Sequence, residues 1–194
     1  MTLPTQSAKR KAAIAAGLKM RGTFVMPVGE LQARGSTMSK KVADTLFGKG
    51  KPQDSQREAR KKAKAKAWKA FSLFIRLRDS DANGIVTCCT CGSRKPWKKV
   101  QAGHYVTRAK EATLFDEQCV QGQCAGCNMW QGGKPLEFEQ YLERKYGKGT
   151  AEKIRIKAVQ PCKRVTSDYL FIEKTFTERV AWIKQHEPSK FTAA

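Results

Sequence analysis

Four cysteines fall in two pairs with the same spacing, Cys88-x-x-Cys91 and Cys124-x-x-Cys127. A Cys-x-x-Cys turn can place two thiolates on one metal ion, and two such turns complete a tetrahedral four-sulfur zinc site. The 32 residues between Cys91 and Cys124 exceed the roughly 15–20 of an ordinary zinc ribbon. This gap leaves room for a functional element between the two halves of the site. The pattern therefore predicts a structural zinc that holds the intervening loop rigid.

Paired cysteines also occur as redox motifs and as disulfides. A thioredoxin-like motif usually uses one pair, and Met1–Arg21 is basic without the sustained apolar run of a signal peptide. We therefore expect a reducing, cytoplasmic compartment, in which paired cysteines indicate metal ligands. Cys89 adjoins Cys88 and could replace it as a zinc ligand, but it does not have the two-residue spacing to Cys91. Cys119 is a weaker candidate for a ligand, and Cys162 is interpreted as an ordinary thiol.

The loop between the pairs carries His104, one of only two histidines. Its imidazole titrates near neutrality and can take a proton from water, which phosphodiester cleavage requires together with a cation for the phosphate charge. Gly103 lets the backbone approach closely, and the carboxamide oxygen of Asn128 can serve the cation. The alternatives are a structural role for His104 and a helix-capping role for Asn128.

The charge of the chain indicates a polyanionic partner. Its 38 Lys and Arg against 17 Asp and Glu give a net charge of +21 and a pI near 9.9, as in nucleic-acid-binding proteins. Residues 1–79 carry +14 of this charge. The alternative interpretation is that the charge belongs to a solvated tail that only keeps the protein soluble. No stretch approaches the roughly 20 apolar residues that a membrane span needs, so we expect no membrane partner. The candidate DNA contacts are Lys98, Lys99, Arg108 and Lys110 around the histidine and Lys61, Lys62, Lys64 and Lys66 before it.

The chain is expected to have three parts. Residues 1–54 are interpreted as a flexible basic arm with one short helix near Ala8–Leu18, residues 55–150 as a helix plus the zinc-bound core, and residues 151–194 as a C-terminal helical segment. The tail after the last helix is expected to be loose.

Periodicity and turn residues predict the elements of these parts. The first helix, Ser55–Asp79, has a basic first half and an apolar stripe in its second half that we assign to core packing. In the last helix, Leu170, Phe171, Phe176, Val180 and Ile183 are expected to face inward. The remaining predictions are strands at Ile85–Thr87, Val100–Val106 and Val120–Cys124 and helices at Pro135–Tyr146, Thr150–Val159 and Ser167–His186.

Three motifs together resemble the NinG/Rap family of lambdoid phage recombination proteins. They are Cys-x-x-Cys-Gly at 88–92, Ala-Gly-His-Tyr at 102–105 and Gln-Cys-x-x-Cys-Asn at 123–128. The run FSLFIRLRD at 71–79 is similar to the segment that precedes the first zinc pair in that family. The resemblance covers roughly residues 65–150, and the combination is specific although each piece alone is weak.

The resemblance implies an α+β fold: a treble-clef ββα-metal (HNH, or His-Me finger) core with a structural zinc, flanked by α-helices and the basic arm. It implies an endonuclease that acts on branched DNA, such as Holliday junctions and D-loops, in phage recombination in the host cell cytoplasm. The family resembles the junction resolvase endonuclease VII, which implies Mg²⁺ or Mn²⁺ at the catalytic site and a homodimer.

Within the resemblance, His104 corresponds to the general base, Asn128 to a ligand of the catalytic metal, and the four paired cysteines to the zinc ligands. The family has an acid three residues before the histidine, where this chain has Gln101. Loss of that charge weakens a site for a hard cation, unless another acid such as Asp116 completes it. The alternatives are a non-catalytic zinc protein that binds branched DNA and an HNH nuclease without structure preference.

Overall fold

The computed structural model describes residues 18–21, 24–27 and 52–192. The chain divides into two units, Met1–Pro52 and Gln53–Ala194. In the first unit, β1 (Leu18–Arg21) pairs antiparallel with β2 (Phe24–Pro27), where the sequence analysis predicted no strand. Most of the short helix expected at 8–18 lies outside the described residues.

The second unit begins with the long helix α4 (Pro52–Arg78), which confirms the expected helix and extends it by three residues at its start. Its sequence is rich in Ala, Lys and Arg, which are good helix formers. Phe71, Phe74 and Ile75 are buried on one face of its second half, whereas the basic residues of its first half are mostly exposed. The apolar stripe is therefore core packing, as expected.

Two antiparallel strand pairs follow. β3 (Ile85–Thr87) pairs with β4 (Arg94–Pro96), and β5 (Val100–His104) pairs with β6 (Val120–Cys124). The register of the second pair sets His104 opposite Val120 and Gln101 opposite Gln123. Short helical turns η1 (Trp97–Lys99) and η2 (Glu111–Thr113) lie in the connections.

Glycine is required at Gly103 in β5 and at Gly122 in β6. A Cβ atom at Gly103 would lie 2.3 Å from Oε1 of Gln123, and one at Gly122 would lie 2.7 Å from Cγ1 of Val86. The two glycines thus let β5 pack against the Gln123 side chain and β6 against β3.

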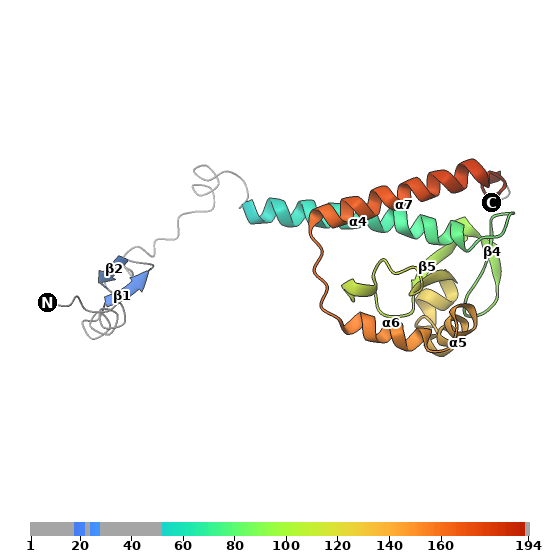
Figure 1. Ribbon diagram of the computed structural model, residues 1–194, viewed down its shortest axis with the longest axis horizontal. Helices are drawn as coiled ribbons and strands as arrows, with labels where there is room; N and C mark the ends of the chain where they lie inside the picture. Colours follow the sequence, from blue (N-terminus) through green and yellow to red (C-terminus); the bar gives the residue numbers. More distant parts are fainter. Residues whose placement is uncertain (1–17, 22–23, 28–51, 193–194) are drawn as a thin grey trace. The chain divides into compact units, whose positions relative to one another are not determined.

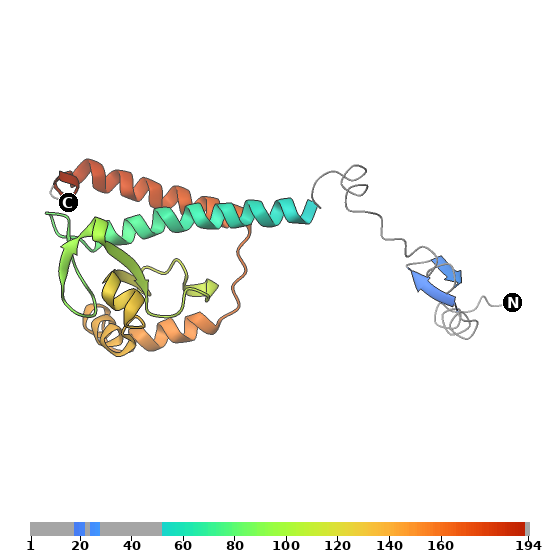
Figure 2. The same cartoon turned by 180° about the vertical axis from the view of Figure 1, so that it is seen from behind.

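Helices α5 (Pro135–Tyr146), α6 (Thr150–Val159) and α7 (Thr166–His186) complete the unit. In Figures 1 and 2, α7 runs alongside α4, and the β5–β6 pair lies between these two helices and the α5–α6 pair. Side chains from all these layers except the small β3–β4 pair form one core. The α+β class expected from the sequence is confirmed.

Two residues of α7 do not face inward as predicted. Leu170 is 50% exposed and Phe171 is 72% exposed. The helix instead buries Tyr169, Phe176 and Ile183, which recur every seven residues and so lie along one stripe facing α4. Leu170 and Phe171 are rotated away from this stripe by one and two residues, at about 100° per residue.

The C-terminal tail, expected to be loose, forms the short helix α8 (Ser189–Thr192). Lys190 is buried, and its Nζ donates to the Leu77 carbonyl at 3.1 Å and pairs with Glu187 at 2.8 Å. Its own carbonyl accepts from Nε1 of Trp97 at 3.0 Å, while Phe191 packs edge-on against the same ring. These long-range contacts fix a segment whose local sequence has little structural signal.

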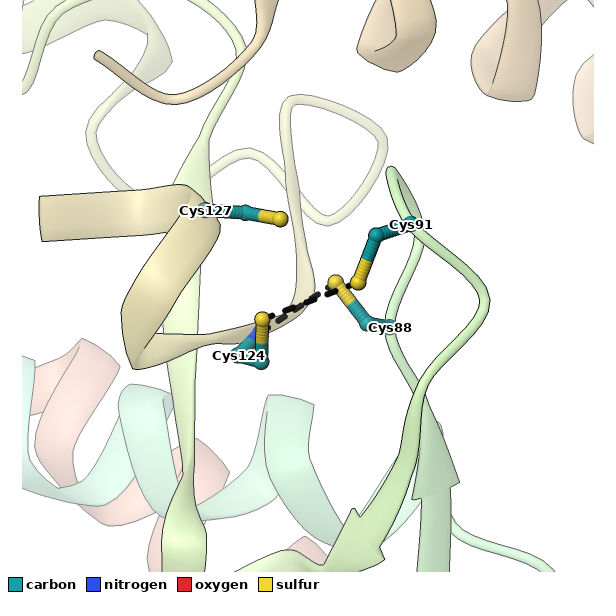
Figure 3. Close-up of side chains that lie close together, drawn as sticks. All are labelled: Cys88, Cys91, Cys124 and Cys127. Carbon is teal, nitrogen blue, oxygen red and sulfur yellow. Dashed lines mark hydrogen bonds between the residues drawn. The ribbon is translucent and has the colours of Figure 1, made fainter. Parts of the chain in front are cut away.

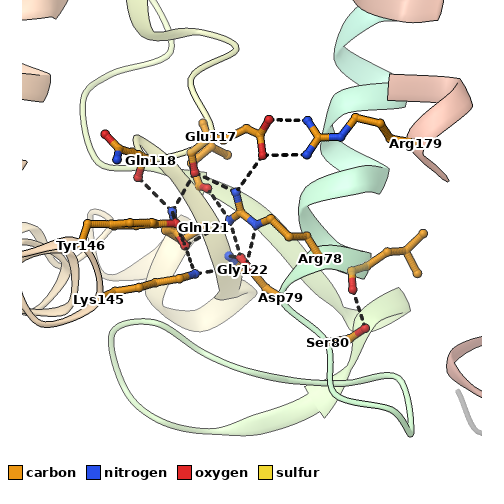
Figure 4. Close-up of polar contacts among 12 residues, drawn as sticks. Arg78, Asp79, Ser80, Glu117, Gln118, Gln121, Gly122, Lys145, Tyr146 and Arg179 are labelled. Carbon is orange, nitrogen blue, oxygen red and sulfur yellow. Dashed lines mark hydrogen bonds and ion pairs between the residues drawn. The ribbon is translucent and has the colours of Figure 1, made fainter. Parts of the chain in front are cut away.

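A network of buried polar groups joins α4 to β6 and α5 (Figure 4). The Asp79 carboxylate, just after α4, accepts from the Gly122 N–H at 2.7 Å and from the Arg78 guanidinium at 2.8 and 3.0 Å. Lys145 of α5 approaches the same carboxylate at 3.4 Å and donates to Oε1 of Gln121 at 2.8 Å. The network orients β6, which ends at the first cysteine of the second pair.

Among the described residues, no helix has the length and apolar character needed to cross a membrane.

Replacing Asp79 with Asn should lower the free energy of unfolding by about 1–3 kcal/mol, because an amide nitrogen would then face buried donors. Urea unfolding followed by circular dichroism measures this. Asp81→Asn is the matched control, since Asp81 pairs with Arg94 at the surface and its variant keeps the oxygen that caps the turn. Equal destabilisation by both substitutions would contradict a special role for Asp79.

Candidate functional site

The four paired cysteines converge on one point. Their Sγ atoms all lie within 4.8 Å of one another, and Figure 3 shows them pointing toward a common centre. Cys91 and Cys124 are 3.8 Å apart at sulfur, which matches the separation of about 3.8 Å for two sulfurs held tetrahedrally at 2.3 Å from zinc. The cluster can therefore hold a zinc ion.

Local turns on both sides prepare this cluster. After β3, the Cys88 N–H donates to Ser93 and the Gly92 N–H donates back to Cys88, with Gly92 at a φ of 72° that favours glycine. This turn folds Cys91 back toward Cys88. On the other side, Cys124 ends β6, and its N–H donates to the Cys88 sulfur at 3.3 Å.

The surroundings of the cluster favour the thiolate form over the thiol at Cys88, even without a metal. The pKa of the Cys88 thiol falls to about 3, chiefly through a hydrogen bond from the Cys89 side chain. Burial raises the pKa of Cys127 to about 12. A divalent cation would offset that cost, since zinc binds cysteine as thiolate.

The other three cysteines lie outside the cluster. Cys89 is buried beside Cys88 in the core, Cys119 is buried just before β6, and Cys162 is half-buried between α6 and α7. The spacing argument thus selects the four residues whose sulfurs meet.

His104 is the last residue of β5, half-buried against α4. Its ring stacks on Trp68, with centroids 5.0 Å apart, and its Nε2 lies 3.1 Å from the Leu114 carbonyl oxygen. A carbonyl oxygen can only accept, so Nε2 carries the hydrogen and Nδ1 keeps its lone pair. Burial lowers the pKa of His104 and the nearby Arg108 charge adds to this, which together outweigh the hydrogen bond with Leu114 that raises it; the imidazole is therefore mainly neutral at pH 7.

Gln101 and Asn128 meet beside this histidine. Asn128 lies in η3 (Gly126–Trp130), a single wide π-helical turn after the second cysteine pair, and its Nδ2 donates to Oε1 of Gln101 at 2.6 Å. The Gln101 Nε2 is 3.1 Å from the Met129 sulfur. Asn128 thus lies inside the turn and bonds across to β5, and does not cap a helix as the alternative supposed.

Two cavities of about 280 and 260 Å³ adjoin these residues, and both are lined by Trp68, Ala102, Arg108 and Asn128. Arg76 and Gln101 line the first cavity only, and His104 lines the second only. Neither lining contains a carboxylate. The site therefore combines a neutral imidazole and two amides with cationic guanidinium groups.

Asp116 is not brought into this group. Its Oδ1 accepts from the N–H groups of Gln118 and Cys119 at 2.8 and 3.1 Å, and its Oδ2 pairs with Lys157 at 2.5 Å. Both carboxylate oxygens are therefore engaged, one in the turn before β6 and the other in the ion pair. Asp116 lines neither cavity.

The structure spreads the predicted basic residues over two elements and a loop. Lys61, Lys62 and Lys66 are exposed on α4, whereas Lys64 pairs with Glu111 at 2.5 Å. The other four predicted contacts are also exposed, Lys98 and Lys99 in η1 and Arg108 and Lys110 in the loop before η2.

Sequence reasoning missed two residues of the site. Trp68 belongs to the apolar stripe assigned to core packing and does pack against the core, but its ring also stacks on His104 and lies 4.0 Å from the guanidinium carbon of Arg108. Arg76 was not singled out, yet it lines the cavity of Gln101 and Asn128. The only signal was helical spacing, since Trp68, Ser72 and Arg76 recur every four residues on α4 and share one face.

The fold and the cysteine cluster define an α+β protein with a four-thiolate metal-type site beside a histidine-containing cavity. A family model described as Bacteriophage Lambda NinG protein matches residues 32–187, and the chain belongs to this NinG family. Membership associates it with phage recombination. Neither the curated proteins nor the solved structures contain a match.

Purified protein should contain about one zinc per chain, measured by elemental analysis. Cys124→Ser should lose the metal and unfold the region around residues 88–128, because structural zinc contributes folding free energy directly. Cys162→Ser is the matched control and should keep both zinc and thermal transition. Zinc-free wild type with an unchanged transition would contradict the assignment.

Proposed function

We propose that this protein is a metal-dependent endonuclease that cuts branched DNA during phage recombination, with a treble-clef, HNH-like core held by zinc. The observation that carries the proposal is the neutral His104, whose Nδ1 keeps its lone pair, beside Asn128 in a cavity lined by arginine. Family membership supports the biological setting. Action as a homodimer and in the cytoplasm of the host cell are further parts of the proposal.

His104 acts as the general base. The Leu114 carbonyl fixes its tautomer, and the Trp68 stack fixes the plane of its ring. Nδ1 can then take a proton from a water molecule as that water attacks the phosphorus. A base with a lowered pKa is unprotonated at neutral pH, which this step requires.

Arg76 and Arg108 hold the phosphate. Each lines a cavity of the site, and neither pairs with a carboxylate among the described residues. By contrast, Arg78, Arg155 and Arg179 all pair with acidic side chains. Burial lowers the pKa of Arg76 and Arg108, but a guanidinium stays protonated at neutral pH, so both keep a charge that a DNA phosphate can neutralise.

The donors suited to Mg²⁺ or Mn²⁺ are the amide oxygens of Asn128 and Gln101. Amide oxygens bind hard cations, although carboxylates bind them more strongly, and water and a DNA phosphate would complete the coordination. When bound, such an ion polarises the phosphoryl oxygens and stabilises the leaving group. The absence of a carboxylate from the cavity lining predicts weak metal binding.

Gln101 also favours a second candidate function, because the position lacks a carboxylate for a catalytic metal. This candidate is a zinc protein that binds branched DNA without cutting it.

The experiment that separates the candidates is incubation of purified protein with a labelled four-way junction and a matched linear duplex, with Mg²⁺, Mn²⁺ or no added divalent metal. A nuclease selective for structure cuts the junction, one without preference cuts both, and a binding protein cuts neither.

His104→Ala should lower the rate of junction cleavage by on the order of 10²–10⁴, the usual contribution of a general base. Zinc content and junction binding should stay close to wild type. His186→Ala is the matched control, since the second histidine is exposed at the end of α7 and its loss should leave cleavage unchanged. An active His104→Ala protein would rule out the mechanism.

Gln101→Asp should lower the Mg²⁺ concentration needed for half-maximal cleavage, because it adds a carboxylate beside Asn128. Metal titrations of the cleavage rate measure this shift. Gln118→Asp adds the same charge at an exposed position outside the cavities and should leave the titration unchanged. Cleavage by Gln101→Asp but not by wild type would identify the natural protein as a binding protein on a nuclease scaffold.

A further inference from the structure

Trp130 is the most exposed large apolar side chain in the described part of the chain, at 81%. It ends the helical turn η3 that carries Asn128. It is two residues from Asn128 and two from Gly132, so its Cα lies within about 7.6 Å of both Cα atoms. An unburied indole thus belongs to the same turn as Asn128, which lines the cavity that holds His104.

The backbone beyond Trp130 leaves an open surface. Gly132 and Gly133 line the cavity of His104, and a Cβ atom built on either would meet no atom within 4 Å. Both have positive φ, 59° and 81°, a conformation that suits glycine. A polymer strand can therefore approach the backbone closely at these two glycines, which follow Trp130 by two and three residues.

The charges around this surface point to a nucleic-acid strand as the occupant. Arg76 and Arg108 line the adjoining cavities without acidic partners among the described residues, and the chain carries a net charge of +21. An exposed aromatic ring next to a cationic track is the arrangement on which single-stranded bases stack. Within a duplex, neighbouring base pairs already cover both faces of a base, so only an unpaired or terminal base offers a free face.

We propose that Trp130 stacks on an unpaired DNA base next to the phosphate that Arg76 and Arg108 hold, and that this contact gives the protein a preference for branches with unpaired nucleotides. The inference rests on the proposed DNA-binding role and deepens it by naming the feature of the substrate that is recognised. It does not depend on catalysis.

The test uses a forked duplex with 2-aminopurine at the first unpaired position and a linear duplex of the same sequence, without added Mg²⁺ or Mn²⁺. Wild type should quench the 2-aminopurine fluorescence on binding. Trp130→Ala should abolish the quenching and weaken binding to the fork by about 5- to 150-fold, the range expected for one stacked base. Its affinity for the linear duplex should be unchanged, and Trp130→Phe should restore most of the fork binding.

Trp182→Ala is the matched control, because Trp182 is also exposed, at 57%, but lies on α7 away from the cavities. It should behave as wild type. Equal affinity of Trp130→Ala and wild type for the fork would overturn the stacking contact while leaving the nuclease proposal intact. Failure of wild type to bind either DNA would overturn both. A changed sedimentation coefficient in Trp130→Ala would assign the indole to a protein interface and overturn the proposal.

Discussion

The convergence of four thiols on one centre is the constraint on which the rest of the site depends. One pair lies on the turn between β3 and β4 and the other spans the end of β6 and the start of η3, so a shared cation would tie the two hairpins together at this point. A tetrahedral ion tolerates little variation in these distances. The same link would hold the end of β6 in place, and with it the start of η3, where Asn128 lies.

The histidine side of the site depends on packing against α4. His104 reaches its position because Gly103 lets β5 approach the Gln123 side chain, and it is held by the Trp68 ring and the Leu114 carbonyl. Both contacts act on the chemistry as well as the position, since burial lowers the pKa of the imidazole and the carbonyl fixes its tautomer. A core helix thereby sets the protonation state of the proposed base.

The basic residues fall into two groups, those that pair with an acidic side chain and those without such a partner among the described residues. Arg78 and Lys145 belong to the first group, and their contacts with Asp79 help to orient β6. Arg76 and Arg108 instead pack on the rings of Trp97 and Trp68 without acidic partners among the described residues. Packing on a ring holds a guanidinium in place while leaving its donors available, which is suited to binding phosphate.

The sequence by itself determined most of the elements after residue 52 and the four cysteines that converge, because both follow from short-range patterns. The spacing of Cys88, Cys91, Cys124 and Cys127 selected the converging sulfurs, and periodicity located the helices closely. Only the tertiary structure decided the long-range contacts: the hydrogen bond between Asn128 and Gln101 beside His104, the ion pair of Asp116 with Lys157 away from that site, and the hydrogen bond from Trp97 to the Lys190 carbonyl. These contacts join residues distant in sequence, and local propensity carries no information about which distant groups a fold brings together.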